Sequence, residues 1–449
     1  MDKTIHLVSL GCPKNLIDSE VMLAALERDG YRVVENPQSA ALILVNTCGF
    51  IQSAAEEAID EILTLSTHKK NNSNQRLVVA GCLVQRYGEQ LREALPEVDL
   101  FLGLDDFPDI AGLLNKEPRP KFIANSGPAV YLMDSMVPRR ISTPFFRAYL
   151  KITEGCDNHC SYCMIPSIRG RLRSRSVPDL VQEAQMLESS GVKELTLIAQ
   201  DLTRYGYDEG LQDGLVTLLQ ALLQETNIPW IRLLYLYPSR VSRALLTLMQ
   251  KEVRIVPYLD IPMQHVSDPV LKAMRRQYGK SQLDELISAV HAYLPDCAIR
   301  TTFMVGFPGE REEDVQLLLT AIAQWRLDHV GVFAYQDEEE CAAFRLPTKA
   351  EEEVKEDRLQ RVMEAQAEIS AHLLSNKIGQ VEPVLIEGIS QESELLLEGR
   401  TRYQAPDIDG CVYISSGEAN VGDILSVRIV DAHVYDLVGE VESPADQNS

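Results

Sequence analysis

Three cysteines in one short segment give the sharpest chemical signal in the sequence. Cys156, Cys160 and Cys163 follow the spacing C-x3-C-x2-C. Three thiolates on one loop can bind three irons of a cubane [4Fe–4S] cluster and leave the fourth iron open. A structural zinc site is the main alternative, but it needs a fourth Cys or His at matching spacing. His159 lies inside the loop and the chain has no second C-x-x-C pair, so the spacing favours a cluster.

An iron with an open position can chelate the amino and carboxylate groups of S-adenosylmethionine (SAM) and deliver one electron to split its sulfonium. Tyr162, directly before the third cysteine, is typical of such a loop. Further SAM contacts are expected where predicted strands end, because barrel sites are built there. The candidates are Gln200, Asp201, Gln264, His265, Gly306, Phe307, Pro308 and Gly309. Each position is equally compatible with an ordinary strand-end turn.

The segment RGRLRSR follows the cysteine loop and places guanidinium groups on alternate positions. Its members are Arg169, Arg171, Arg173 and Arg175. One or two of them, with Arg175 as the first candidate, could bind the SAM carboxylate or an acidic group of the substrate. The alternative is a solvated charge run in an acidic protein. Its position beside the cluster loop favours the binding role.

Three further cysteines each follow a strand-like run near the N-terminus. Cys12 follows IHLVSL, Cys48 follows ALILVNT and Cys82 follows RLVVAG. In an open parallel sheet these strand ends share one edge, where such folds bind ligands. Adjacent glycines, which permit close approach to a bulky cofactor, are Gly11, Gly49 and Gly81. The pattern favours a second cluster over three buried core cysteines, whereas the core interpretation is favoured for Cys297, Cys341 and Cys411.

The pattern along the chain predicts an α/β protein with three domains. Residues 1–107 alternate strand-like and helix-like runs, which predicts an N-terminal parallel-sheet domain. Residues 108–144 are a predicted linker containing Pro and Gly. Residues 145–376 hold six β/α units and predict a partial (β/α)6 barrel. Residues 377–449 predict a small antiparallel, OB-like β-barrel. The six expected central strands are AYLKIT, ELTLIAQ, WIRLLYLY, YLDIPM, IRTTFMVG and HVGVFAY.

Composition and charge narrow the classes of function. The formal net charge of −23 repels polyanions, so the chain is not a general nucleic-acid binder. Its apolar runs are too short to span a bilayer, and MDKTIHLVSLGC lacks the apolar region of a signal peptide. Nine cysteines suit metal ligands or free thiols better than disulfides. We therefore expect a cytoplasmic protein without membrane association.

Motifs along nearly the whole chain resemble the methylthiotransferase family of radical SAM enzymes. They are SLGCPKN at 9–15, NTCGFI at 46–51, AGC at 80–82, EGCDNHCSYCMIP at 154–166 and TFMVGFPGE at 302–310. The last block resembles a TRAM domain. The resemblance implies that Cys12, Cys48 and Cys82 hold an auxiliary [4Fe–4S] cluster. It implies that the C-x3-C-x2-C loop holds the cluster that cleaves SAM.

The resemblance also implies that SAM is used twice. One SAM methylates a sulfur carried on the auxiliary cluster, and another yields a 5′-deoxyadenosyl radical that abstracts hydrogen from an unactivated C–H bond. The carbon radical then takes the methylthio group. Such an enzyme implies an electron donor protein and a sulfur source as partners. Two alternatives are a cluster-binding scaffold without turnover and a radical enzyme that inserts sulfur without a methyl group.

Two branches of this family differ in substrate. GCPKN, NTCGFI, LIAQDLTRYG at 197–206 and RTRYQAPDIDG at 400–410 resemble the branch that modifies the β-carbon of an aspartate in the twelfth protein of the small ribosomal subunit. The other branch modifies adenosine in tRNA. Residues 380–449 contain fourteen Asp and Glu, three Arg and no Lys, which suits a basic ribosomal protein better than tRNA, although acidity can also serve solubility alone.

One stretch departs from the pattern of the ribosomal-protein branch. That branch usually reads YS-x-E-E-G-T-x-A after the sixth central strand, whereas residues 335–343 here read YQDEEECAA. The Gly-Thr pair is absent. The departure puts the local loop geometry in doubt and leaves the six cluster cysteines unaffected.

Overall fold

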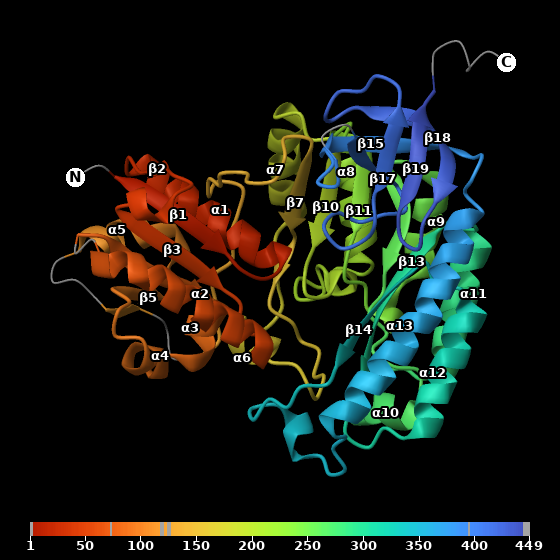
Figure 1. The fold of residues 1–449 in the computed structure, drawn as a ribbon, viewed down its shortest axis with the longest axis horizontal. Coiled ribbons are helices and arrows are strands. Elements are labelled where there is room, and N and C mark those ends of the chain that lie inside the picture. The colour runs from red at the N-terminus through yellow and green to blue at the C-terminus, as the bar shows by residue number, and fades with distance from the viewer. Residues whose placement is uncertain (1–2, 72–73, 117–120, 124–126, 394–395, 443–449) are drawn as a thin grey trace.

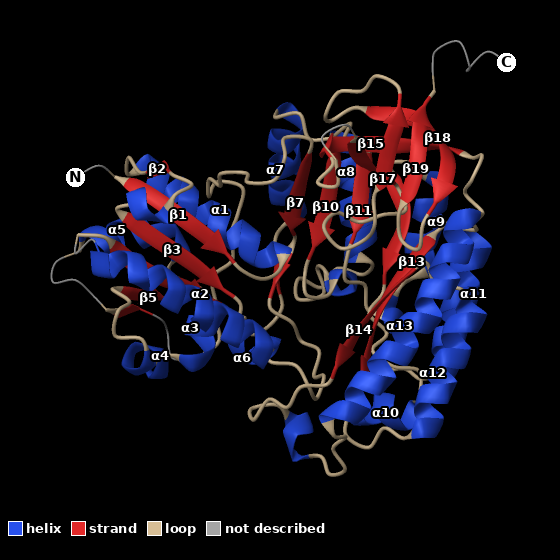
Figure 2. Cartoon of the chain, viewed as in Figure 1, coloured by secondary structure: helices blue, strands red, loops and turns tan. Residues whose placement is uncertain are grey.

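The computed structural model describes residues 3–71, 74–116, 121–123, 127–393 and 396–442. Three bodies follow one another along the chain (Figure 1). An N-terminal α/β domain lies beside a central sheet covered by long helices, and a small β-barrel stands at one end of that sheet (Figure 2). Within the described residues, no helix is both long enough and apolar enough to cross a membrane.

The N-terminal domain contains a six-stranded sheet in the order β2-β1-β3-β4-β5-β6, with every pairing parallel. All six residues of the central strand LILVNT are buried, as expected for a parallel strand covered on both faces. The strands are β1 (Thr4–Ser9), β2 (Arg32–Val33), β3 (Leu42–Thr47), β4 (Arg76–Gly81), β5 (Leu100–Leu102) and β6 (Phe122–Ile123). The helices are α1 (Pro13–Arg28), α2 (Gln52–Asn71), α3 (Cys82–Tyr87), α4 (Glu89–Ala94) and α5 (Ile110–Asn115).

The segment predicted as a linker, 108–144, is structured in part. Helix α5 lies within it, and β6 extends the N-terminal sheet beyond residue 107. A strand of two residues is too short to show alternation in the sequence. Positions 117–120 and 124–126 of this segment lie outside the described residues.

The central domain confirms all six predicted strands. They form one parallel sheet in the order β14-β13-β12-β11-β10-β7, an open partial barrel. The strands are β7 (Arg147–Lys151), β10 (Glu194–Ile198), β11 (Trp230–Leu233), β12 (Ile255–Asp260), β13 (Ala298–Val305) and β14 (His329–Ala334). The longer helices are α7 (Val177–Ser189), α8 (Gly214–Glu225), α9 (Arg243–Lys251), α11 (Lys280–Tyr293), α12 (Glu312–Trp325) and α13 (Glu352–Ser375). Shorter elements are β8 (Thr153–Glu154), α6 (Ile165–Ile168), β9 (Arg173–Ser174) and α10 (Asp268–Ala273).

The C-terminal domain is a closed barrel of five strands, β15-β16-β17-β19-β18. The prediction of an antiparallel barrel needs one correction, because β17 and β19 pair in parallel. The other pairings are antiparallel. The four antiparallel pairings around the barrel reverse the chain direction an even number of times between β17 and β19. These two strands therefore point in the same direction, and the pair that they form must be parallel. The strands are β15 (Val381–Ile389), β16 (Leu397–Thr401), β17 (Val412–Ser416), β18 (Ile424–Ala432) and β19 (Leu437–Val441).

A buried ion network fastens the C-terminal barrel to the central sheet. Glu194 of β10 is fully buried and accepts from Arg232 Nε at 2.5 Å and Arg400 Nη2 at 2.5 Å. Arg400, on β16, also pairs with Glu387 at 2.8 Å. Burial opposes ionisation of Glu194, but Arg400 and Arg232 outweigh it and lower the pKa of this carboxyl from 4.5 to about 2. The ionised carboxylate therefore stabilises the folded chain at pH values above the pKa of this carboxyl group in the unfolded chain.

We expect this stabilisation to be lost as pH falls from about 4.5 towards 2, where the folded-state carboxyl titrates. A shift of this size contributes up to about 3 kcal/mol to the free energy of unfolding at neutral pH. Denaturant unfolding of the apoprotein at pH 7 and at about pH 3, compared with Glu194→Gln, measures the contribution. Wild type should lose more stability than the variant in this window. Equal losses would show that Glu194 does not carry the effect.

Candidate functional site

Three loops at one edge of the N-terminal sheet carry Cys12, Cys48 and Cys82. The strands that precede them, β1, β3 and β4, are neighbours in the sheet, so their carboxyl ends meet. Cys12 is the N-cap of α1, Cys48 follows β3, and Cys82 is the first residue of α3. The fold thus brings together three cysteines that are far apart in the sequence.

Two glycines let these loops pack closely. Gly11 and Gly81 have φ angles of +98° and +106°, which a side chain disfavours. A Cβ on Gly11 would lie 2.9 Å from Cβ of Cys48, and one on Gly81 would lie 2.4 Å from Oδ1 of Asn46. The atoms that approach these glycines most closely belong to the end of β3 and to Cys48 after it, so the two glycines let the Cys12 and Cys82 segments pack against the Cys48 segment.

A cavity of about 490 Å³ lies where the N-terminal domain meets the central sheet. Its size is in the range of small-molecule sites. The second cysteine loop, after β8, opens into the same space. All six cluster candidates line it: Cys12, Cys48, Cys82, Cys156, Cys160 and Cys163. Two sets of three thiols from two domains therefore face one cavity.

Four predicted SAM contacts also line this cavity, namely Tyr162, Gln200, Asp201 and Gln264. Both amide atoms of Gln200 are buried and lack a hydrogen-bond partner in the described part of the chain. A buried polar group without a partner is costly. The Gln200 amide therefore has hydrogen-bonding capacity that the described residues leave unused.

Asp201 holds the loop between Cys156 and Cys160. Its Oδ2 accepts from Asn158 Nδ2 and from Arg240 Nη1, each at 2.8 Å. Arg240 Nη2 in turn donates to Asn158 Oδ1 at 2.9 Å. This closed set of hydrogen bonds fixes the cysteine loop to the carboxyl end of β10.

Gly306 and Phe307 lie outside the walls of the cavity. Phe307 is fully buried, and its ring meets that of Tyr162 edge-on with centroids 6.3 Å apart. The backbone N–H of Gly306 donates to the carboxylate of Glu310. His265 also pairs with Glu310, at 3.0 Å. Phe307 thus contacts the cavity through Tyr162, which forms part of the cavity wall.

The structure brings one arginine of RGRLRSR to the cavity, and it is not Arg175. Arg175 lies outside the cavity walls, because its guanidinium pairs with Asp179 at 2.7 Å and with Glu183 at 2.6 Å. These acids lie on α7, four and eight residues after Arg175, so this pairing is local in the sequence. Arg169 lines the cavity instead.

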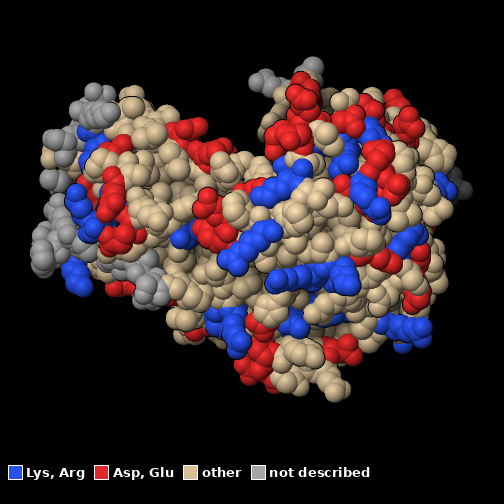
Figure 3. Space-filling view, turned by 90° about the horizontal axis from the view of Figure 1, so that it is seen from below, with Lys and Arg blue, Asp and Glu red and all other residues tan. Residues whose placement is uncertain are grey.

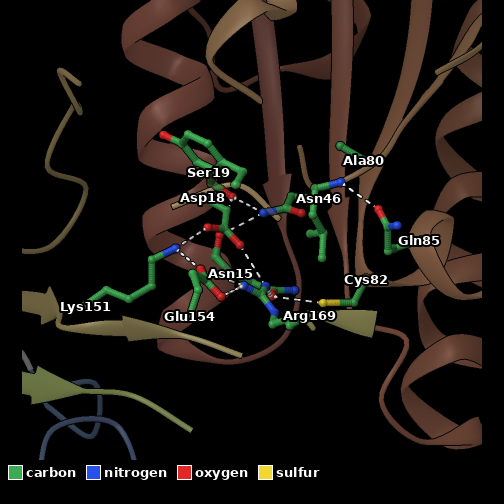
Figure 4. A network of polar contacts seen from close by, with 12 residues as sticks. Asn15, Asp18, Ser19, Asn46, Ala80, Cys82, Gln85, Lys151, Glu154 and Arg169 are labelled. Carbon is green, nitrogen blue, oxygen red and sulfur yellow. Dashed lines mark hydrogen bonds and ion pairs between the residues drawn. The ribbon is translucent and has the colours of Figure 1, made fainter. Parts of the chain in front are cut away.

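Arg169 belongs to a buried ion network between the two domains (Figure 4). Its Nη2 donates to Asp18 Oδ2 and Asn15 Oδ1, each at 2.7 Å, and its Nη1 lies 3.2 Å from the Glu154 carboxylate. Lys151 Nζ lies 2.7 Å from Asp18 and 2.5 Å from Glu154. All four charged residues are at most 5% exposed. Since Asp18 and Asn15 belong to α1, the network ties the N-terminal domain to the central one.

Arg276 is a residue of the site that the sequence did not indicate. Its Nη1 donates to Cys160 Sγ at 3.3 Å, and its Nε donates to the hydroxyl of Tyr278 at 2.5 Å. The guanidinium groups of Arg276 and Arg240 each lie 4.2 Å from the ring centroid of Tyr237. Arg276 and Cys160 are 116 residues apart, so no local spacing could have revealed the contact.

The thiols differ in how readily they ionise. Burial opposes ionisation of Cys12, but Lys14, Arg169 and nearby backbone N–H groups outweigh it and lower the pKa. Burial raises the pKa of Cys82 to about 12 and that of Cys156 to about 11. The thiolate is the form that binds metal, so Cys12 is the most readily available ligand of these three.

The donor sets fit iron–sulfur clusters. No three His, Cys, Asp or Glu side chains in the described ranges are placed to hold one metal ion. A cubane cluster uses its cysteines on separate irons, and three thiols around an open cavity suit it. The other cysteines, Cys297, Cys341 and Cys411, do not line this cavity.

The atypical loop after β14 joins the central domain to the N-terminal one. Glu338 accepts from Arg86 Nη2 at 2.5 Å and from the backbone N–H of Gln52 at 2.7 Å. Arg86 Nη1 also donates to the carbonyl of Gly49, the residue after Cys48. Cys341 is 4% exposed and packs in the hydrophobic core. The loop therefore supports the Cys48 loop, although it lacks the usual Gly-Thr pair.

Comparison with known proteins identifies the family. Residues 4–103 match Uncharacterized protein family UPF0004, residues 150–322 the Radical SAM superfamily and residues 378–441 the TRAM domain. One relative is the Desulfotalea psychrophila protein named "Ribosomal protein uS12 methylthiotransferase RimO". It is 53% identical over 98% of this chain and 99% of its own length. The chain belongs to the RimO family of radical SAM methylthiotransferases.

Other RimO proteins are similar over the same length. That of Pelobacter propionicus is 48% identical over 98% of both chains, and that of Geobacter sulfurreducens is 46% identical over 98% of both. The predicted resemblance to the ribosomal-protein branch is confirmed.

Solved structures share the fold. The radical SAM methyltransferase TsrM of Kitasatospora setae matches with a TM-score of 0.58 at 14% identity, over 77% of this chain and 74% of TsrM. The cobalamin-dependent SAM radical enzyme OxsB matches with a TM-score of 0.51 at 13% identity, over 80% of this chain and 56% of OxsB. At these identities the likeness concerns the fold alone.

Proposed function

We propose that this RimO-family protein adds a methylthio group to the β-carbon of an aspartate in ribosomal protein uS12, with SAM as both methyl donor and radical source. The observation that carries the proposal is one cavity lined by two sets of three cysteines from two domains. Cys156, Cys160 and Cys163 would hold one [4Fe–4S] cluster. The second would be held by Cys12, Cys48 and Cys82.

The bound groups would supply one-electron cleavage of SAM and a sulfur atom next to the substrate carbon. The protein side chains position these groups. Asp201 holds the SAM-cluster loop through Asn158 and Arg240, and the free amide of Gln200 is available to SAM. The Arg169 network fixes the distance between the domains that carry the two sets of thiols.

The hydrogen bond from Arg276 to Cys160 gives a prediction for the SAM cluster. A positive donor on a ligand sulfur favours the reduced, more negative cluster, so Arg276→Gln should lower its midpoint potential. A charge-assisted hydrogen bond corresponds to a shift of roughly 60–120 mV for one electron. Redox titration followed by electron paramagnetic resonance measures the midpoint potential. The potential of Arg276→Lys should lie between those of wild type and Arg276→Gln. An unchanged potential in Arg276→Gln would contradict this role.

Charge supports a protein substrate over tRNA. All three arginines of residues 380–449 pair with carboxylates: Arg400 with Glu194, Arg402 with Glu382, and Arg428 with Glu442. None is left unpaired to contact phosphate, whereas the acidic excess suits a basic ribosomal protein. We propose that the acidic TRAM barrel contacts uS12 in part. Figure 3 shows the face seen from below, where Lys and Arg are interspersed with Asp and Glu.

Further partners follow from the proposed chemistry. Cleavage of SAM requires an electron donor protein, and methylthio transfer requires a sulfur source. A ribosomal substrate places the activity in the cytoplasm.

Mass spectrometry of uS12 from cells with and without the gene tests the proposal. We expect uS12 to be heavier by one CH2S unit only when the gene is present. An unchanged uS12 mass together with altered tRNA adenosine would favour the tRNA-modifying activity. Absence of 5′-deoxyadenosine from the reduced, reconstituted protein would favour a scaffold. Deoxyadenosine without S-adenosylhomocysteine would indicate sulfur insertion without methyl transfer.

A further inference from the structure

Lys14 lines the cavity without an acidic partner. Its Nζ donates to the carbonyl of Ala199 at 3.2 Å and lies 3.9 Å from the ring centroid of Tyr235. No Asp or Glu of the described residues forms an ion pair with it; Asp260 acts on it only from a longer distance. Arg169, in contrast, already has two carboxylate partners.

The position of Lys14 is costly unless an anion binds there. Lys14 is 8% exposed. An ammonium has three N–H donors, and the carbonyl of Ala199 takes one. A buried charge with no counter-charge in contact is unfavourable, and the face of an aromatic ring offsets only part of that cost. At least one donor of Lys14 therefore remains for a ligand in the cavity.

The residue beneath Lys14 is held in a strained backbone conformation. Tyr235 has a φ angle of +68°, which is uncommon for a bulky residue and recurs at functional sites. Its N–H is held by Asp260 Oδ2 at 3.0 Å. Both Tyr235 and Lys14 line the cavity. The strained backbone conformation of Tyr235 therefore lies at the point where its ring contacts the Lys14 ammonium.

Lys14 lies on the side of the cavity that belongs to Cys12. It is two residues from Cys12 in the sequence, in the first turn of α1, the helix that Cys12 caps. At the same time Lys14 reaches the end of β10 in the central domain through Ala199. An anion at Lys14 would therefore lie between the two domains, beside the auxiliary set of thiols.

We propose that the Lys14 ammonium binds the carboxylate of the substrate's target aspartate. This inference rests on the proposed function and adds the residue that selects the target. The β-carbon is bonded directly to the carboxylate carbon, so a fixed carboxylate also fixes the β-hydrogens inside the cavity. Asparagine would lose the charge-assisted contact.

Two peptides test the proposal on the reconstituted holoenzyme. One carries the uS12 sequence around the target aspartate, and the other has asparagine in its place. We expect wild type to prefer the aspartate peptide by roughly 100-fold in kcat/KM. Lys14→Met should lose that preference, because it lowers kcat/KM for the aspartate peptide and leaves that for the asparagine peptide unchanged. Lys14→Arg should retain most of it. If Lys14→Met lowers kcat/KM for both peptides equally, Lys14 acts on the cluster and the proposal is wrong.

Peptide affinity, measured by fluorescence anisotropy with the same proteins and peptides, needs no turnover. Failure of wild type to modify either peptide would overturn the proposed function, whereas a preference for aspartate that depends on Lys14 would still support this inference. Equal affinities in wild type would overturn it. Lys14→Gln repeats the charge change if Lys14→Met loses iron. Lys3→Met is the matched control, because Lys3 is exposed at the opposite end of β1 and pairs with Asp29.

Discussion

Replacing Cys156, Cys160 and Cys163 together by alanine is expected to abolish cleavage of SAM and to remove about half of the bound iron. These three cysteines are the only thiols that the described residues of the central domain contribute to the cavity. Among the described residues, no other set of Cys, His, Asp or Glu side chains is placed to bind a metal ion in their stead. Iron and 5′-deoxyadenosine are measured on the same reduced, reconstituted samples. The remaining iron should belong to the cluster of the N-terminal domain.

A matched variant controls for the loss of a thiol. Cys411 is half-buried in the C-terminal barrel, outside the cavity, so Cys411→Ala should keep both its iron and its SAM cleavage. Full iron content in the triple variant, or undiminished deoxyadenosine, would contradict the assignment of the loop.

The second large effect is expected from Arg169→Met. This change leaves Asp18 and Glu154 buried, with Lys151 as the one ion-pair partner that remains to them among the described residues. Breaking a buried charge network by removing one partner costs about 3–5 kcal/mol, a large part of the stability of a typical domain. Because the network joins α1 to the central domain, denaturant unfolding should show a lower midpoint and separate transitions of the two domains.

Arg171→Met is the control for this prediction. Arg171 belongs to the same RGRLRSR segment but is exposed, so its replacement should change the free energy of unfolding by less than about 0.5 kcal/mol. Equal destabilisation by the two variants would show that the network does not hold the domains together.

The sequence predicted those parts of the molecule whose signals are local or repeat at regular spacing. Six apolar runs separated by helical stretches were sufficient for the central sheet. The positions of Cys12, Cys48 and Cys82 after three strands were sufficient to place them together, because parallel strands share one carboxyl edge. Gln200 and Asp201 were found by the same rule.

The remaining features depend on contacts between distant elements. The two residues of β6 gain strand character only by pairing with β5, and the parallel closure of β17 on β19 follows from the path of the whole barrel. Arg175 is the exception, because the acids that pair with it, Asp179 and Glu183, follow it by only four and eight residues. Arg276 and Lys14 reached the cavity through tertiary contacts with Cys160 and Ala199.

The measurement that most directly tests the proposed division of labour uses a variant with Cys12, Cys48 and Cys82 all changed to alanine. The reconstituted variant and wild type are incubated with uS12, SAM and a reductant, and both products are quantified by mass spectrometry. We expect both proteins to form 5′-deoxyadenosine, while only wild type yields uS12 heavier by one CH2S unit. Methylthiolated uS12 from the variant would contradict it.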